Sequence, residues 1–372
     1  MKRVTITLAA LLLALVMVLS TACQAAPSGG APAPAPEGGK PSAPSAGGYL
    51  GDTRVAVNPD IQNDGVNRLG VAFSAVKYSA IQMLYRYYET QHKNFGFDDF
   101  IGLSADSDLE TQINQIQDLI NQKCDVIIVN SVDSQGIAPV CQRAMEAGIA
   151  VMAVDRKIGT GIYYTLETDN VSAGRDVAMT VADRTFYPGI ADGAVKVMYV
   201  IGDMASSAQH DRLEGLKQTL EYYPWIKVVA TPSALELSKV YDAVVDAFTS
   251  DPDIKAVFVT GGDDSVTPVV SALRELGKLY PVDDPNYVYI GSVDGAPNAL
   301  EAIKNGESSF TANQRFDLFG TQIMAVAKDY LEGKYVSSTA NNVQLSCSMV
   351  MRENLARLEQ LGVLWGLKDE IS

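Results

Sequence analysis

Apolar residues recur along this chain in two alternating patterns from about Arg68 onward. Short continuous apolar runs, such as Leu69–Phe73 and Ile149–Val154, predict strands that are covered on both faces. The segments between these runs repeat apolar residues at helical spacing, as from 108 to 122. Because strand and helix patterns alternate, the chain predicts an α/β fold with parallel sheets and helices on both faces.

The same alternation resumes after Asn170 and continues to about Leu331. Its predicted strands include Val195–Ile201 and Ala256–Val259. The number of βα units is too high for one ordinary open sheet, so two αβα lobes fit the pattern, as does a closed barrel on counting alone. In both architectures ligands bind beyond the carboxyl ends of the strands.

The N-terminus has the layout of an export signal. Lys2 and Arg3 precede an apolar run that extends to about Leu19, and the small residues before Cys23 follow it. This arrangement resembles a bacterial lipoprotein signal, residues 1–22, that is cut before Cys23 and lipidated there. An uncleaved membrane anchor is the alternative, because the run is almost long enough to span a bilayer. Both interpretations place the protein outside the cytoplasm.

Residues 23–66 predict a lipid anchor followed by a flexible spacer. Pro, Ala, Gly and Ser dominate this stretch through Gly48, and it contains almost nothing to bury. Such a segment cannot offset its ordering entropy by packing.

Charge and cysteine content exclude several classes of protein. Lys and Arg number 29 against 44 Asp and Glu, which gives a net charge of −15 and argues against nucleic acid as a partner. Beyond Cys23 the cysteines are Cys124, Cys141 and Cys347, which we interpret as buried thiols, with a Cys124–Cys141 bridge as the alternative. With two histidines and no CxxC motif, the sequence predicts neither a metal site nor a cofactor.

Polar residues rich in carboxylate, amide and guanidinium groups follow the predicted strands. Such two-pronged groups suit a neutral polyhydroxy ligand, and an aromatic ring can cover its C–H surface. Each has a structural alternative, such as an Asx turn, a helix N-cap or a loop ion pair. The candidate ligand-binding residues are Ser74, Tyr78, Asn130, Asp155, Arg156, His210, Asp263, Asp294 and Gln314.

Several of these residues lie in motifs that resemble the type I periplasmic sugar-binding proteins, and most of all their ribose and galactose branch. The motifs occur in order between about Arg68 and Val350, and they are Val154–Arg156, Thr168–Asn170, Ile290–Pro297 and Phe310–Gln314. The resemblance implies two αβα lobes joined by a three-segment hinge. We expect residues 67–170 plus 315–343 in the N-terminal lobe and 171–314 plus 344–372 in the C-terminal lobe.

The resemblance also implies that Asn130, Asp155, Arg156, Asp294 and Gln314 hydrogen-bond a sugar. The chain departs from the ribose binders of that family at other positions. Their two stacking phenylalanines align with Ala80 and Ile81, an arginine aligns with His210, an aromatic residue with Leu235 and an asparagine with Gly262. The polar contacts are therefore expected to persist while the stacking walls differ.

These observations predict an extracytoplasmic, monomeric solute-binding protein that delivers a monosaccharide or similar polyol to an ABC import permease. The alternative is a sensor for a nucleoside or small signalling polyol that feeds a membrane receptor. We expect no catalytic residue, because the chain has neither a glycine-rich turn after its first strand nor a GxSxG elbow. Sequence alone leaves open a glycosidase pair of Asp155 and Asp294.

Overall fold

The computed structural model describes residues 64–334 and 341–368, and these form two open sheets, each with six described strands. The signal segment, Cys23 and most of the predicted spacer lie outside the described residues. Two open sheets flanked by helices confirm the predicted α/β fold class, and they rule out the closed barrel for the described part of the chain. No helix within 64–334 or 341–368 is long and apolar enough to cross a membrane.

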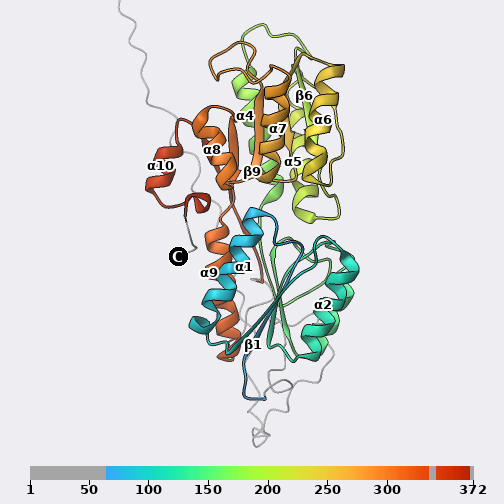
Figure 1. Ribbon diagram of the computed structural model, residues 1–372, viewed down its shortest axis with the longest axis vertical. Helices are drawn as coiled ribbons and strands as arrows, with labels where there is room; N and C mark the ends of the chain where they lie inside the picture. The colour runs from blue at the N-terminus through green and yellow to red at the C-terminus, as the bar shows by residue number, and fades with distance from the viewer. Residues whose placement is uncertain (1–63, 335–340, 369–372) are drawn as a thin grey trace, which may run out of the picture. The chain divides into compact units, whose positions relative to one another are not determined.

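The first sheet has the strand order β11-β5-β4-β3-β1-β2, and all of its pairings are parallel. Its strands are β1 (Arg68–Phe73), β2 (Asp99–Ser104), β3 (Val126–Asn130), β4 (Ala150–Asp155), β5 (Tyr164–Thr168) and β11 (Asn342–Leu345). Helices α1 and α9 lie side by side against this sheet (Figure 1). Helices α2 and α3 form another pair. These helices are α1 (Ser79–Gln91), α2 (Leu109–Asn121), α3 (Ala138–Glu146) and α9 (Phe316–Leu331), with the short turn η2 (His92–Phe95) after α1. We call this sheet with its helices the first lobe.

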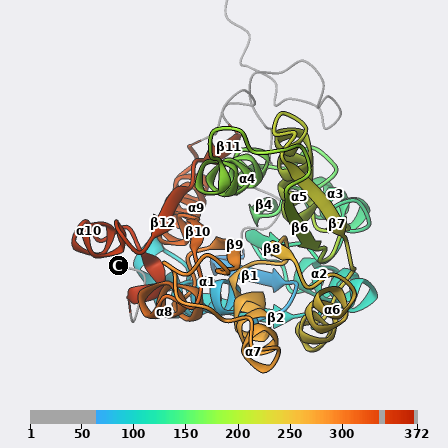
Figure 2. The same cartoon turned by 90° about the horizontal axis from the view of Figure 1, so that it is seen from above.

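The second sheet has the order β12-β10-β9-β8-β6-β7, and β12 runs antiparallel to β10 at one edge (Figure 2). Its strands are β6 (Val195–Val200), β7 (Ile226–Ala230), β8 (Ile254–Val259), β9 (Tyr289–Asp294), β10 (Phe310–Asn313) and β12 (Ser348–Met351). Its helices are α4 (Asn170–Thr185), α5 (Ser207–Leu220), α6 (Leu237–Ser250), α7 (Val266–Glu275) and α8 (Pro297–Asn305). The short elements η3 (Asp263–Ser265), α10 (Leu355–Gln360) and η4 (Trp365–Leu367) complete this list. We call this sheet with α4 to α8 the second lobe.

Buried apolar side chains fill the interior of both lobes. The strands β3 and β4 are buried at every position, as expected for parallel strands with helices on both faces. In the second lobe, one apolar cluster joins α6 and α7 to the sheet, and another joins α4 and α5 to its opposite face. Cys124 and Cys141 are buried free thiols, which agrees with the prediction, and Cys347 is also free.

The chain connects the two sheets at three places. It passes from β5 into α4 at Asp169, from β10 into α9 through Gln314 and Arg315, and from β11 into β12 through residues 346–347. At the first two passages the side chains meet, because Thr168 Oγ1 donates a hydrogen bond of 2.5 Å to Gln314 Oε1. Both residues are buried, so this bond fixes one passage against the other.

Candidate functional site

A pocket lies among the carboxyl ends of strands from both lobes. Its polar lining consists of Asp155, Arg156, Ser206, Gln209, Arg212, Asp264, Ser265 and Asp294. Its apolar and aromatic lining consists of Tyr78, Ala80, Ile81, Ala208, Ala234, Leu235, Leu237 and Phe316, and Gly202 and Gly261 complete it. This position agrees with the rule that open α/β sheets bind ligands beyond their strand ends.

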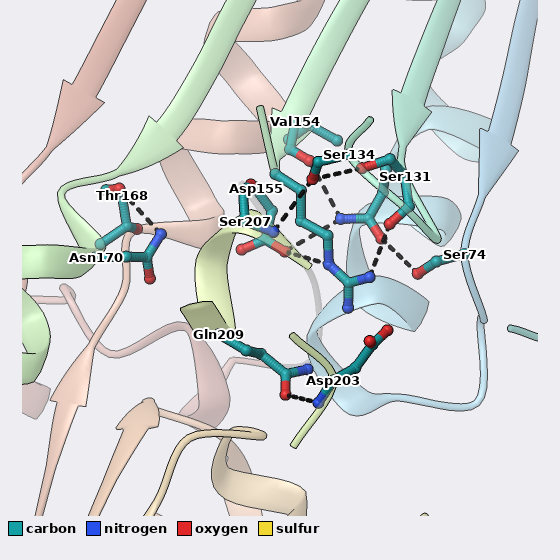
Figure 3. A network of polar contacts seen from close by, with 12 residues as sticks. Ser74, Ser131, Ser134, Val154, Asp155, Thr168, Asn170, Asp203, Ser207 and Gln209 are labelled. Carbon is teal, nitrogen blue, oxygen red and sulfur yellow. Dashed lines mark hydrogen bonds and ion pairs between the residues drawn. The ribbon is translucent and has the colours of Figure 1, made fainter. Parts of the chain in front are cut away.

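On the first lobe, Asp155 ends β4 and belongs to a buried hydrogen-bond network (Figure 3). Asn130 Nδ2 donates to Asp155 Oδ2 at 3.1 Å, and Ser74 Oγ donates to Asn130 Oδ1 at 2.6 Å. The neighbouring Arg156 donates through Nη1 to the Ser131 carbonyl at 2.7 Å. Ser74 and Asn130 therefore support Asp155 from behind, and neither lines the pocket.

On the second lobe, Asp294 ends β9 and is held by side chains from other elements. Arg212 Nη2 donates to Asp294 Oδ1 at 3.2 Å, and Gln314 Nε2 donates to the same oxygen at 2.5 Å. Gly262 adopts φ +94°, and a Cβ there would lie 2.2 Å from Asp294 Oδ2. Gln314 thus contacts the Asp294 carboxylate and does not itself line the pocket.

Both carboxylates lie on strained backbone. Asp155 has φ 68° and Asp294 has φ 135°, a region that residues other than glycine seldom adopt. Such strain costs about 1–3 kcal/mol and clusters at functional sites. The strand end of each lobe therefore presents one carboxylate at an energetic cost, which points to a function for this pair.

Three buried polar atoms of pocket-lining residues lack a hydrogen-bond partner within the described residues. They are Asp155 Oδ1, Arg156 Nε and Ser206 Oγ. Asp155 is 5% exposed and Ser206 is fully buried. Leaving such groups without a hydrogen bond costs about 1–3 kcal/mol each, so the pocket is suited to a ligand that carries hydroxyl groups.

Burial also alters the titration of Asp294. Burial is the largest cause and raises its pKa to about 6, the Arg212 guanidinium opposes that rise, and the Asp155 charge adds to it. A carboxyl group with a raised pKa in the folded state contributes stability that is present below its unfolded pKa and is lost as pH rises through about 6. Asp294 therefore destabilises the folded protein at neutral pH.

We expect Asp294→Asn to raise the free energy of unfolding relative to the wild type at pH 7.5. The difference should shrink as the pH falls from 7.5 to 5, because the wild-type carboxyl then takes up a proton. Urea unfolding at several pH values measures this difference. The exposed Asp283 offers a matched control, since Asp283→Asn changes the same charge at the surface. If the free energy of unfolding varied with pH identically in Asp294→Asn and the wild type, the raised pKa of Asp294 would be contradicted.

The structure does not bring Asp263 and His210, both predicted as ligand contacts, to the lining of the pocket. Asp263 is fully buried, and its carboxylate accepts hydrogen bonds from the Gly295 and Ala296 amides and from Thr311 Oγ1. It therefore fixes the turn that follows Asp294, and burial together with the Asp294 charge raises its pKa. His210 lies on an exposed part of α5 and pairs with Asp211 at 3.0 Å.

Sequence reasoning missed Arg212, Ser206, Gln209, Asp264 and Phe316 as pocket residues. Arg212 lies two positions after His210 on α5, and its side chain is 4% exposed. Its Nε donates to Asn170 Oδ1 at 2.8 Å, and its Nη1 donates to the Thr260 carbonyl at 3.2 Å. The sequence analysis aligns an arginine of the ribose binders with His210. Shifting that alignment by two residues would have placed the arginine at Arg212.

Direct contacts between the lobes flank this pocket. On one side the Asp264 carboxylate accepts from the Ser79 backbone N–H at 3.1 Å and from Ser79 Oγ at 2.7 Å. On the other side Ser207 Oγ accepts from the Lys157 N–H at 3.0 Å, and Lys157 Nζ pairs with Asp211 at 2.6 Å. These contacts bring the strand ends of both lobes to a single site.

Known proteins are similar to this chain in sequence. The chain is 29% identical over 273 residues to the ribose import binding protein RbsB of Bacillus subtilis (strain 168), which covers 73% of this chain and 84% of that protein. It is 28% identical over 270 residues to a xylitol-binding protein of Mycolicibacterium smegmatis, which covers 69% of this chain and 73% of that protein.

Solved structures show the same fold. An ABC transporter solute-binding protein of Bacillus halodurans with bound myo-inositol matches with a TM-score of 0.71 and 23% identity, over 80% of this chain and 99% of that one. A Mycobacterium smegmatis protein in complex with β-D-fucofuranose matches with a TM-score of 0.72 and 22% identity, over 82% and 98% of the two chains. A family model described as a periplasmic binding protein domain matches residues 78–335, which is more than half of the chain. The resemblance inferred from the sequence is thus confirmed, and the chain belongs to the periplasmic binding protein family.

Proposed function

We propose that this protein is an extracytoplasmic solute-binding protein that captures a monosaccharide or similar polyol between its lobes and delivers it to an ABC import permease. The main support for this proposal is a pair of carboxylates on strained backbone, Asp155 and Asp294, which lie at strand ends of opposite lobes and line one pocket. Each is an acceptor for ligand hydroxyls, and the guanidinium groups of Arg156 and Arg212 are donors. The ribose and xylitol relatives support the ligand class.

The ligand acts by linking the lobes. A molecule that contacts both carboxylates stabilises the arrangement in which the lobes meet, by its differential affinity for that arrangement. The hinge would consist of the three passages at Asp169, at Gln314–Arg315 and at residues 346–347, the last directly after the predicted 343–345. The predicted lobe boundaries, 67–170 plus 315–343 and 171–314 plus 344–372, are part of this proposal, except that β11 places residues 344–345 in the first lobe.

The pocket walls favour a ligand that does not need an aromatic ring stacked on each of its faces. Ala80 and Ile81 line it from the start of α1, and Leu235 and Leu237 line it from the second lobe. Phe316 and Tyr78 supply its aromatic rings. Aliphatic walls contact the C–H surface of a polyol through dispersion and do not require a flat ring.

We infer that the protein carries out no covalent chemistry. The Asp294 carboxylate accepts hydrogen bonds from Arg212 and Gln314, and the Asp155 carboxylate accepts one from Asn130. Both carboxylates are therefore held in place as hydrogen-bond acceptors. The proposal further includes an N-terminal lipid anchor at Cys23, a monomeric state and a position at the cell envelope. A mass measurement of the exported chain tests the anchor, because diacylglyceryl addition at Cys23 changes its mass.

A thermal-shift screen on the full-length chain in detergent tests the proposed ligand class. The panel contains D-ribose, xylitol, myo-inositol, D-allose, L-arabinose, disaccharides and nucleosides. A ligand present at about a thousand times its dissociation constant adds about 4 kcal/mol of stability. At about 2–4 °C per kcal/mol, we expect a clear rise in melting temperature with one or two related polyols. A shift with nucleosides alone would favour the sensor alternative, and no shift with any compound would contradict the proposal.

A further inference from the structure

We propose that Trp365, in the C-terminal segment, is a positioning residue that holds the ligand-binding carboxylate Asp294 in place. This inference rests on the function proposed above. Trp365 does not line the ligand pocket, so it acts on the ligand through residues that do. Trp365 lies 71 positions from Asp294 in the sequence, so only the folded chain brings the two residues together.

The indole of Trp365 makes a direct bond to the strained residue. Trp365 Nε1 donates to the Asp294 backbone carbonyl at 2.7 Å, and the side chain is 1% exposed. A buried bond to that carbonyl opposes rotation of the peptide that follows Asp294. The same carbonyl accepts a second hydrogen bond of 3.0 Å from the Gln314 N–H, so the indole is one of two donors that hold it. Because φ of Asp294 is 135°, loss of the indole donor leaves this strained backbone less firmly held and lets the carboxylate shift.

The same ring also packs against the pocket wall of the first lobe. The centroids of Trp365 and Phe316 are 5.2 Å apart at 70°, an edge-to-face contact. Phe316 lines the pocket at the start of α9, directly after the Gln314–Arg315 passage. Trp365 therefore joins the end of β9 in the second lobe to the start of α9 in the first.

Residues next to Trp365 also hold the C-terminal segment close to the turn after β9. A Cβ placed on Gly366 would lie 2.3 Å from the Gly295 carbonyl, so only glycine allows this approach. Lys368 Nζ lies 3.8 Å from Asp317 Oδ2 on α9. The contact is thus built by several residues of the C-terminal segment and is not a chance position of one side chain.

The chain supplies a matched control, since it has two tryptophans. Trp225 packs against Tyr223 and Phe186 at centroid distances of 5.1 and 5.2 Å, and it does not line the pocket. Trp365→Phe keeps an aromatic ring and removes the N–H donor, and Trp225→Phe makes the same change elsewhere.

The test uses the full-length chain and measures binding of D-ribose, xylitol and myo-inositol by titration calorimetry. We expect Trp365→Phe to weaken the binding of whichever probe binds the wild type by about tenfold. This is the effect expected when one hydrogen bond that positions a ligand-binding side chain is lost. Trp225→Phe should bind like the wild type. In hydrogen exchange without ligand, peptides that cover residues 290–298 should exchange faster in Trp365→Phe and unchanged in Trp225→Phe.

Fluorescence adds a readout that a purely structural role would not move. In Trp225→Phe, emission comes from Trp365 and should change when the probe binds, whereas the Trp225 emission of Trp365→Phe should not. Wild-type affinity in Trp365→Phe, or unchanged exchange over 290–298, would overturn the inference.

A second variant separates positioning from loss of folding. Gly366→Ala keeps the indole and displaces the turn, and it should also weaken binding, while Gly161→Ala is its control because nothing lies within 4 Å of a Cβ there. Unchanged binding in Gly366→Ala would count against the inference. If the wild type binds none of the probes, the proposed function fails, and the exchange experiment still decides whether Trp365 positions Asp294.

Discussion

Asp155→Ala should weaken sugar or polyol binding by about 30- to 150-fold, the equivalent of about 2–3 kcal/mol. The wild-type carboxylate is buried, and its Oδ1 has no partner within the described residues. The variant removes that acceptor, so a ligand hydroxyl would enter the pocket without its hydrogen bond. Asn130 Nδ2 and Arg156 would each lose one of their partners as well. Titration calorimetry with the best compound of the thermal-shift panel measures the loss.

Two further variants sharpen this prediction. Asp155→Asn keeps the size of the side chain and replaces one acceptor oxygen by a donor, so it should also bind weakly. Asp176→Asn is the control, because Asp176 pairs with Arg175 at the surface of α4. Wild-type affinity in both Asp155 variants would remove Asp155 from the site.

Gly215→Ala should lower the free energy of unfolding by about 1–3 kcal/mol or more, because α4 and α5 touch backbone to backbone. A Cβ on Gly215 would lie 2.0 Å from the Val171 carbonyl, and a Cβ on Gly174 would lie 2.1 Å from the Arg212 carbonyl. Neither neighbour is the end of a flexible side chain, so the helices must separate. Urea or thermal unfolding measures the change, and Gly174→Ala should behave alike.

The same variants should weaken ligand binding, since α5 carries Arg212 and α4 begins at Asn170. Moving these helices apart breaks the bond between Arg212 Nε and Asn170 Oδ1, which aims the guanidinium at Asp294. Gly161→Ala should leave stability within about 0.5 kcal/mol of the wild type. An unfolding midpoint of Gly215→Ala equal to that of the control would contradict the close packing of these helices.

Strand periodicity predicted the position of Asp155, and the family resemblance added Asp294. A continuous apolar run ends at Val154, directly before Asp155, whereas the apolar run that precedes Asp294 ends at Ile290. Parallel strands bring such ends to one edge of a sheet. The alternation of strand and helix also predicted both lobes. The local patterns fit both two lobes and a closed barrel, and the family resemblance favoured the two lobes.

Other parts of the site depend on which way a side chain turns, and local patterns do not determine that. Asp263 follows a strand as Asp155 does, yet its carboxylate turns inward to the Gly295 and Ala296 amides. Arg212 was missed because helical residues two positions apart point to different faces, so His210 is exposed while Arg212 is buried. Phe316 was missed because it begins a helix, where an aromatic residue indicates packing.

The contacts that flank the pocket differ in how they respond to salt. Ser79 offers neutral donors to Asp264 at the start of α1, a helix whose own N-cap residue makes no side-chain bond. Lys157 and Asp211 on the other flank form an ion pair whose lysine is half exposed. Mobile ions screen exposed ion pairs far more than hydrogen bonds from uncharged groups. Rising ionic strength therefore weakens the Lys157–Asp211 ion pair, while the hydrogen bonds on both flanks, including the one from the Lys157 N–H to Ser207 Oγ, persist. The ion content of the surrounding medium thus tunes one flank of the pocket more than the other.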